Sequence, residues 1–224
     1  GGGAYNFAYW VSAIGGGHGN VASNRSYVGG GANNVAAPSN SMDAFVGAGL
    51  GNKVYASQSA IVGGSYNVIS NLAVSSLIGG GQGNILSGRG NSAIVGGSGN
   101  TINYTNSGPQ GARFSFIGGG SGNKVTEAYG SVLGGFGNSV GGMYGTAGGY
   151  GAQALHSGSW VWSDFQQGRS FASVTTNEFA IRASGGVRLE AKLQVTGEAR
   201  FYGPIYISPA GDLGMGTYTN GMLP

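Results

Sequence analysis

The chain has 224 residues, of which 50 are Gly, 5 are Pro and none is Cys. Apolar residues make up 40% of it and charged residues only 8%, the reverse of the balance in disordered chains, so we expect a folded protein. The net charge is +3 and few cations lie close together, which gives no nucleic-acid or anionic-membrane footprint. The absence of Cys excludes disulfides and thiolate metal sites, and no apolar run is long enough to insert into a membrane.

A repeat dominates residues 1–155. Nine times an apolar residue, here called the anchor, is followed by Gly and then by Gly or Ala, at intervals of 14 to 22 residues. The anchors are Ile14, Val28, Val46, Val62, Ile78, Val95, Ile117, Leu133 and Ala147. Asn follows the glycines in eight repeats, and the residue two positions beyond each Asn is apolar. Alternation over so few residues predicts short strands joined by tight Gly-Gly-x-x-Asn turns.

Repeats of this kind predict a parallel β-solenoid, in which each strand pairs with the same strand one repeat away. We expect nine to ten coils, and at about 4.8 Å per coil they would extend for about 45 Å.

The two strands of a coil differ on their outer faces. If the anchors fill the interior, the residue before each anchor exposes a large apolar stripe: Tyr27, Phe45, Ile61, Leu77, Ile94, Phe116 and Val132. The second strand places mixed residues outside, including Lys53 and Lys124. A continuous apolar stripe on a solenoid normally marks an interface, so we expect an oligomer packed on the first strand.

The recurring Ser-x-apolar-Gly segments identify a family resemblance. Ser12-Ala-Ile-Gly, Ser76-Leu-Ile-Gly and Ser131-Val-Leu-Gly resemble the head repeats of YadA-like trimeric autotransporter adhesins. The resemblance covers roughly residues 1–155 and implies a left-handed parallel β-roll assembled as a homotrimer. The chain departs from these heads in its longer, irregular repeats and its additional Gly-Asn turn.

The repeat rhythm breaks near Gly158. The segments 159–164, Ser-Trp-Val-Trp-Ser-Asp, and 177–187 resemble a module that follows such repeats in phage tail-fibre-like and bacterial fibre proteins. Beyond it, apolar residues occur in short alternating pairs up to Pro224. We therefore expect three parts: β-roll repeats over 1–157, a connector over 158–190, and an intertwined trimeric β shaft or tip over 191–224 that is truncated or processed at its end.

No motif points to catalysis, a cofactor or a metal. Gly15 to Asn20 superficially resembles a phosphate-binding loop, but it recurs without a following helix or a Lys. The turns carry Asn where calcium-binding repeats need Asp. His18 and His156 are far apart and have no ligand spacing. Trp160 and Trp162 are interpreted as packing residues.

A glycosidase, the main enzyme alternative, needs two carboxyl groups several Å apart. Residues 1–157 offer only Asp43 and Glu127, from distant coils. The remaining acids show no pairing, so we expect a protein that is not an enzyme, although a site shared between protomers stays open from sequence.

Binding is better placed on the return loops, where solenoid insertions collect. Side chains suited to carbohydrate hydroxyls occur in three of them: Tyr104, Asn106, Gln110 and Arg113; Asn40 and Asp43; Arg89 and Asn91.

Together these features predict an extracellular, homotrimeric attachment fibre that binds a cell-surface glycan or protein receptor. The first hypothesis is the receptor-binding or distal segment of a phage-like tail fibre on a virion. The alternatives are the head of a bacterial surface adhesin, a glycan-degrading tailspike and a purely structural spacer.

Overall fold

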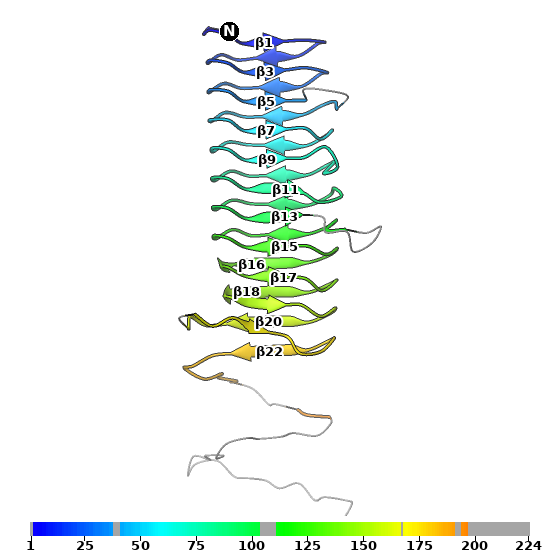
Figure 1. The fold of residues 1–224 in the computed structure, drawn as a ribbon, viewed down its shortest axis with the longest axis vertical. Helices are drawn as coiled ribbons and strands as arrows, with labels where there is room; N and C mark the ends of the chain where they lie inside the picture. The colour runs from blue at the N-terminus through cyan, green and yellow to red at the C-terminus, as the bar shows by residue number, and fades with distance from the viewer. Residues whose placement is uncertain (1, 38–40, 104–110, 167, 191–193, 197–224) are drawn as a thin grey trace, which may run out of the picture. The chain divides into compact units, whose positions relative to one another are not determined.

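The computed structural model describes residues 2–37, 41–103, 111–166, 168–190 and 194–196. The chain divides into two compact units, Gly1–Gly185 and Gly186–Pro224. The first unit is a β-solenoid, and the described part of it contains no helix. The predicted all-β parallel solenoid is therefore confirmed (Figure 1).

Each coil contributes one strand to each of two parallel sheets of eleven strands. Sheet A contains β2 (Ala13–Ile14), β4 (Tyr27–Val28), β6 (Phe45–Val46), β8 (Ala60–Ile61), β10 (Leu77–Ile78), β12 (Ala93–Ile94), β14 (Phe116–Ile117), β16 (Ser131–Phe136), β18 (Thr146–Tyr150), β20 (Trp160–Ser163) and β22 (Phe179–Arg182).

Sheet B contains β1 (Phe7–Ala8), β3 (Val21–Ala22), β5 (Val35–Ala36), β7 (Lys53–Val54), β9 (Val68–Ile69), β11 (Ile85–Ser87), β13 (Thr101–Asn103), β15 (Lys124–Val125), β17 (Ser139–Val140), β19 (Ala152–Ala154) and β21 (Phe171–Ala172). Strands of two to six residues suffice because every inner strand is paired on both sides.

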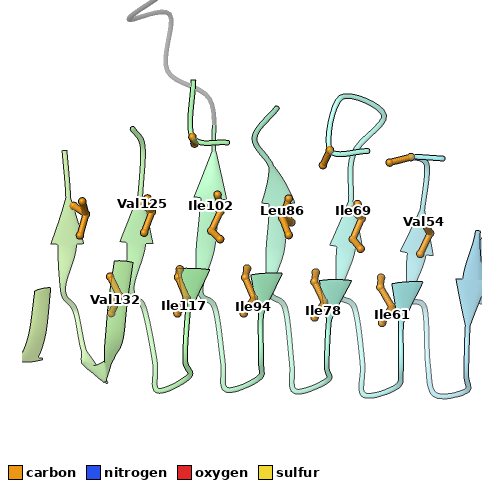
Figure 2. Close-up of a cluster of buried hydrophobic side chains, with 14 of the residues drawn as sticks. Val54, Ile61, Ile69, Ile78, Leu86, Ile94, Ile102, Ile117, Val125 and Val132 are labelled. Atoms are coloured by element: carbon orange, nitrogen blue, oxygen red, sulfur yellow. The ribbon is translucent and has the colours of Figure 1, made fainter. Parts of the chain in front are cut away.

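The core lies between the sheets as two facing rows of aliphatic side chains (Figure 2). Sheet A supplies Val28, Val46, Ile61, Ile78, Ile94, Ile117 and Val132, and sheet B supplies Val54, Ile69, Leu86, Ile102, Val125 and Val140. All of these side chains are fully buried. Each coil therefore adds one aliphatic side chain from each sheet, and burial of these groups is the main stabilising contribution.

A buried row of Asn side chains closes one edge of the core, here called the turn edge because sheet A leads into sheet B there. The backbone N–H of Asn84 donates to Oδ1 of Asn67 (3.0 Å), and Nδ2 of Asn84 donates to the carbonyls of Gly80 (2.9 Å) and Gly97 (3.0 Å). The pattern recurs at Asn34, Asn52, Asn100, Asn123 and Asn138. The Asn that the sequence pattern assigns to the turn is therefore a buried residue, and its side chain satisfies the hydrogen-bonding needs of nearby backbone groups.

The turns depend on glycine because the coils approach each other through their backbones. Gly81 has φ +89°, and a Cβ added to it would lie 2.0 Å from the carbonyl oxygen of Gly97. No side chain fits at that distance, so glycine is required both for the conformation and for the approach.

The predicted phase of sheet A is wrong in three coils. Ile61, Ile94 and Val132, predicted to lie in the exposed stripe, are fully buried, whereas the predicted anchors Val62, Val95 and Leu133 are 53–55% exposed. The buried residue always precedes the interior Asn by six positions, as Ile61 precedes Asn67. In these three coils an apolar residue replaces the first of the glycines that usually follow the buried residue. The residue directly before the Gly pair is therefore the exposed one, and the prediction is shifted by one position.

The solenoid also extends beyond Gly158, where the sequence predicts a connector. β20 pairs with β18 and β22, and β21 pairs with β19, so 158–182 continue both sheets. The strand pairing therefore continues across the predicted boundary between 157 and 158. In the second unit, the described residues 186–190 and 194–196 contain no strand, and most of the predicted shaft over 191–224 lies outside the described residues.

Candidate functional surfaces

The outer face of sheet A carries one large apolar side chain in each of seven successive coils, on or directly after strands β4 to β16. Each is 39–55% exposed; together they form the apolar stripe, Tyr27, Phe45, Val62, Leu77, Val95, Phe116 and Leu133. Four of the predicted interface residues, Tyr27, Phe45, Leu77 and Phe116, belong to it.

Each coil contributes one large side chain to the stripe, from either of the two positions that flank the buried residue. Where the large side chain precedes the buried residue, a glycine follows the buried residue. A Cβ on Gly47, for example, would lie 3.5 Å from Cε1 of Phe45 and 2.1 Å from the carbonyl oxygen of Val62. Where the preceding residue is small, as at Ala60, the following residue is large, as at Val62. One large side chain per coil is the quantity preserved.

The stripe is interrupted at β18, where Thr146 and Gly148 provide no large apolar group. The ring of Trp162 from the next strand extends over Gly148, with Cε3 3.3 Å from where its Cβ would be. Trp162 is 40% exposed and lines a shallow apolar depression with Leu133. Trp162 therefore packs on Gly148 with one part of its ring and exposes the rest.

The outer face of sheet B has a different character. It exposes Lys53 and Lys124, and it carries half-buried Thr101, Ser139 and Gln153. The mixed outer face predicted for the second strand is confirmed.

The return edge, where sheet B leads on to the next strand of sheet A, holds the variable loops. The step from one buried residue to the next takes six positions from Ala22 to Val28 but fifteen from Ile102 to Ile117. The predicted loop residues belong to this edge, but Asn40, Tyr104, Asn106 and Gln110 lie outside the described residues.

The remaining loop candidates do not form one site. Asp43 accepts two hydrogen bonds from Arg25, at 3.0 and 2.8 Å. Arg89 and Asn91 lie one coil away from Arg113, because the N–H of Arg89 donates to the carbonyl of Gly111 at 3.2 Å. The Arg113 guanidinium carbon lies 5.5 Å from the centre of the Phe114 ring. These contacts order the loops without bringing Asp43 to the others.

Two rows of aromatic side chains, which the sequence interpretation missed, lie at opposite edges of sheet A. At the return edge the corner ladder is Phe114, Tyr129 and Tyr144, with successive ring centroids 5.3 and 4.9 Å apart. At the turn edge the turn ladder is Phe136, Tyr150 and Phe165, with centroids 5.3 and 4.8 Å apart. The sequence does carry a signal for the corner ladder: an aromatic residue lies three positions before the buried residue in three consecutive coils.

The corner ladder occupies backbone positions that bulky residues disfavour. Phe114, Tyr129 and Tyr144 have φ of 54°, 58° and 60°, in the left-handed region. The equivalent position is left-handed in other coils too, for example at Arg25, Gln58 and Asn91. A left-handed bulky residue costs about 1–2 kcal/mol, and stacking within the corner ladder offsets part of this cost.

The last coil contains an ion pair whose arginine also binds backbone carbonyls. Arg182 of β22 donates to the carbonyls of Arg169 (2.9 Å) and Ser170 (3.1 Å) and forms an ion pair with Asp164 at 3.4 Å. Hydrogen bonds from Ser184, together with the charge of Arg182, hold the pKa of Asp164 below its ordinary value. The group links the end of sheet A to the loop before β21.

Two further features of the chain bear on catalysis and metal binding. Nδ1 of His156 lies 2.9 Å from Oγ of Ser173, but this Oγ also accepts the N–H of Leu155 at 3.0 Å and Ser173 is only 3% exposed. A buried, fully engaged hydroxyl is a structural group rather than a nucleophile. Among the described residues, no three His, Asp or Glu side chains gather as a metal site would require.

Comparison with known proteins gives no assignment: no protein-family model matches the chain, and no curated protein matches it. In the part of the chain that the structure describes, no helix has the length and apolar character needed to cross a membrane.

Proposed function

We propose that the chain is a protomer of an extracellular homotrimeric fibre that serves in attachment, as the receptor-binding or distal segment of a phage-like tail fibre. The single observation that supports this most is the apolar stripe. It runs along seven successive coils of sheet A, whereas the outer face of sheet B, which also exposes Ile85, is interrupted by Lys53, Thr101 and Lys124. A continuous apolar surface of this length favours a partner that follows it coil by coil.

A second copy of the chain has the required repeat. Every copy presents the same stripe with the same axial spacing, and rotational symmetry then brings equivalent coils together. The resemblance of the repeats to trimeric adhesin heads supports three copies, a left-handed coil and an intertwined trimeric segment after the solenoid. It also supports the alternative of a bacterial surface adhesin head.

Attachment is supported by the contrast between the two edges. The turn edge is uniform from β2 to β17, whereas the return edge carries loops of different length with polar side chains such as Arg89 and Asn91 (Figure 1). Variable loops on one edge of a rigid solenoid are the usual place for binding a cell-surface glycan or protein receptor.

Two matched substitutions test the assembly. Leu77 on sheet A and Ile85 on sheet B are both 41% exposed and lie on consecutive strands, β10 and β11. Light scattering should give three copies for the unmodified chain, fewer for Leu77→Lys and three for Ile85→Lys. A monomeric unmodified chain, or equal effects of the two substitutions, would contradict the trimer.

The attachment role is tested separately with the labelled trimer on host cells and on a glycan array. We expect binding that weakens sharply for Leu77→Lys, because separate copies lose multivalency. A stable trimer that binds neither cells nor glycans would leave the assembly intact and refute the attachment role.

A further inference from the structure

The two aromatic ladders share the same coils. Tyr129 lies two positions before β16, and Phe136 is its last residue; Tyr144 and Tyr150 stand in the same relation to β18. An aromatic side chain at each end of two successive strands, half-buried at Tyr150 and exposed at the other three positions, places the two ladders at the same level along the solenoid axis over these coils.

The ladders are poorly suited to stacking on a sugar. The rings of Phe114, Tyr129 and Tyr144 lie within 13–16° of parallel, so their faces are largely occupied by one another. Tyr129 and Tyr144 are still 37% and 60% exposed, which leaves ring edges outward. Aromatic edges pack well against the faces or edges of other aromatic rings.

The turn ladder offers such a surface. Phe136 and Phe165 are 53% and 67% exposed, and Phe165 meets Tyr150 at an interplanar angle of 78°. Each edge of sheet A at this level therefore carries apolar rings that the chain's own packing leaves partly in water.

We infer that in the assembly the corner ladder of one copy packs against the turn ladder of the next, forming an aromatic seam between protomers. The inference rests on the proposed trimer. If the stripes of three copies face one axis, the return edge of each sheet A meets the turn edge of its neighbour, and equivalent coils meet at equal height.

The buried area favours this arrangement. Seven half-exposed side chains of the stripe leave roughly 500 Å² in water, less than the roughly 800 Å² that each partner buries in a standard interface. The ladders flank the stripe at β16, where Tyr129 and Phe136 stand on either side of Leu133, and they add further exposed apolar area.

The absence of Cys from the sequence permits a direct test with the double variant Tyr129→Cys/Phe136→Cys. Within one copy the two positions lie at opposite ends of β16, roughly 20 Å apart, which is too far for a disulfide. Three bonds between neighbours would close a ring, so mild oxidation should give a covalent trimer on a non-reducing gel.

Each single-cysteine variant, and Lys53→Cys/Lys124→Cys on sheet B, serve as controls that should give no covalent trimer. A trimer by light scattering without the cross-link would overturn the seam and leave the proposed function standing. A monomeric unmodified chain would overturn both.

The unmodified chain provides a second test, because its own tyrosines can form the cross-link. Photo-oxidation should join Tyr144 of one copy to Tyr150 of the next as dityrosine, identified by mass spectrometry in covalent dimers and trimers. Tyr150→Phe should abolish this linkage; inter-chain species that persist unchanged would contradict the seam.

A third measurement separates the seam from protomer folding. Tyr129→Asn removes the ring and introduces a residue type that tolerates the left-handed backbone. It should leave circular dichroism unchanged and raise the concentration at which trimers dissociate by about tenfold or more. Unchanged dissociation would count against the seam.

Discussion

Sheets A and B share one core but differ on their outer faces. Ile78 of sheet A and Leu86 of sheet B are both fully buried and lie in facing rows (Figure 2). Outside, sheet A repeats one large apolar side chain per coil from β4 to β16, whereas sheet B alternates Val, Lys, Ile and Thr. The fold places the same demand on both sheets inside and none outside, so packing within the chain does not account for the difference between the two outer faces.

The largest expected effect tests whether the two sheets contribute equally to the stability of the core. Ile78→Ala and Leu86→Ala should each lower the free energy of unfolding by about 2–5 kcal/mol, because both create a cavity in the same core. Urea denaturation followed by circular dichroism measures the loss. Lys53→Ala, at an exposed position on the outer face of sheet B, is the control and should cost less than about 1 kcal/mol.

If Leu86→Ala cost much less than Ile78→Ala, sheet B would be the looser half of the solenoid. The difference between the two outer faces would then follow from poorer packing of one sheet.

The next effect concerns the interior row of Asn at the turn edge, which joins the sheets. Asn84→Ala removes the amide that binds the carbonyls of Gly80 and Gly97 and accepts the N–H of Asn100. Leaving buried backbone groups unsatisfied should cost about 1–3 kcal/mol. Asn33 is adjacent to interior Asn34 but has a left-handed backbone, with φ of 56°, so Asn33→Gly should cost little.

Equal destabilisation by Asn84→Ala and Asn33→Gly in the same denaturation experiment would show that the interior position of Asn84 has no special role. The two sheets would then be joined by turn geometry alone.

The smallest effect concerns the last coil, where Arg182 links sheet A to the loop before β21. The folded pKa of Asp164 lies below its ordinary value of 3.8, so the charged carboxylate contributes stability above that pH. This contribution is lost as the pH falls below 3.8 through the folded pKa. Hydrogen-exchange protection of the Ser184 N–H, which donates to Asp164, should decline in that window.

Asp164→Asn should remove this pH dependence and leave protection in the middle coils, such as at the N–H of Asn84, unchanged. Protection of Ser184 that responds to acid equally in the variant would assign the effect to another group.

The amino-acid sequence by itself determined the coil: its strand–turn–strand order, its parallel pairing and its two apolar rows. These follow from short-range rules, because alternation sets the faces of a strand and glycine sets the turn. The mixed outer face of sheet B, with Lys53 and Lys124, was predictable for the same reason.

Only the tertiary structure decided the phase and the edges. Ile61 and Val62 are both apolar, and which of them is buried depends on the fixed distance to interior Asn67, since that side chain must reach the carbonyls of neighbouring coils. Tyr129 and Phe136 lie seven positions apart in sequence and at opposite edges of one sheet. Their partners are rings 14 or 15 positions away, brought into contact because stacking of coils replaces sequence neighbours with neighbours in space.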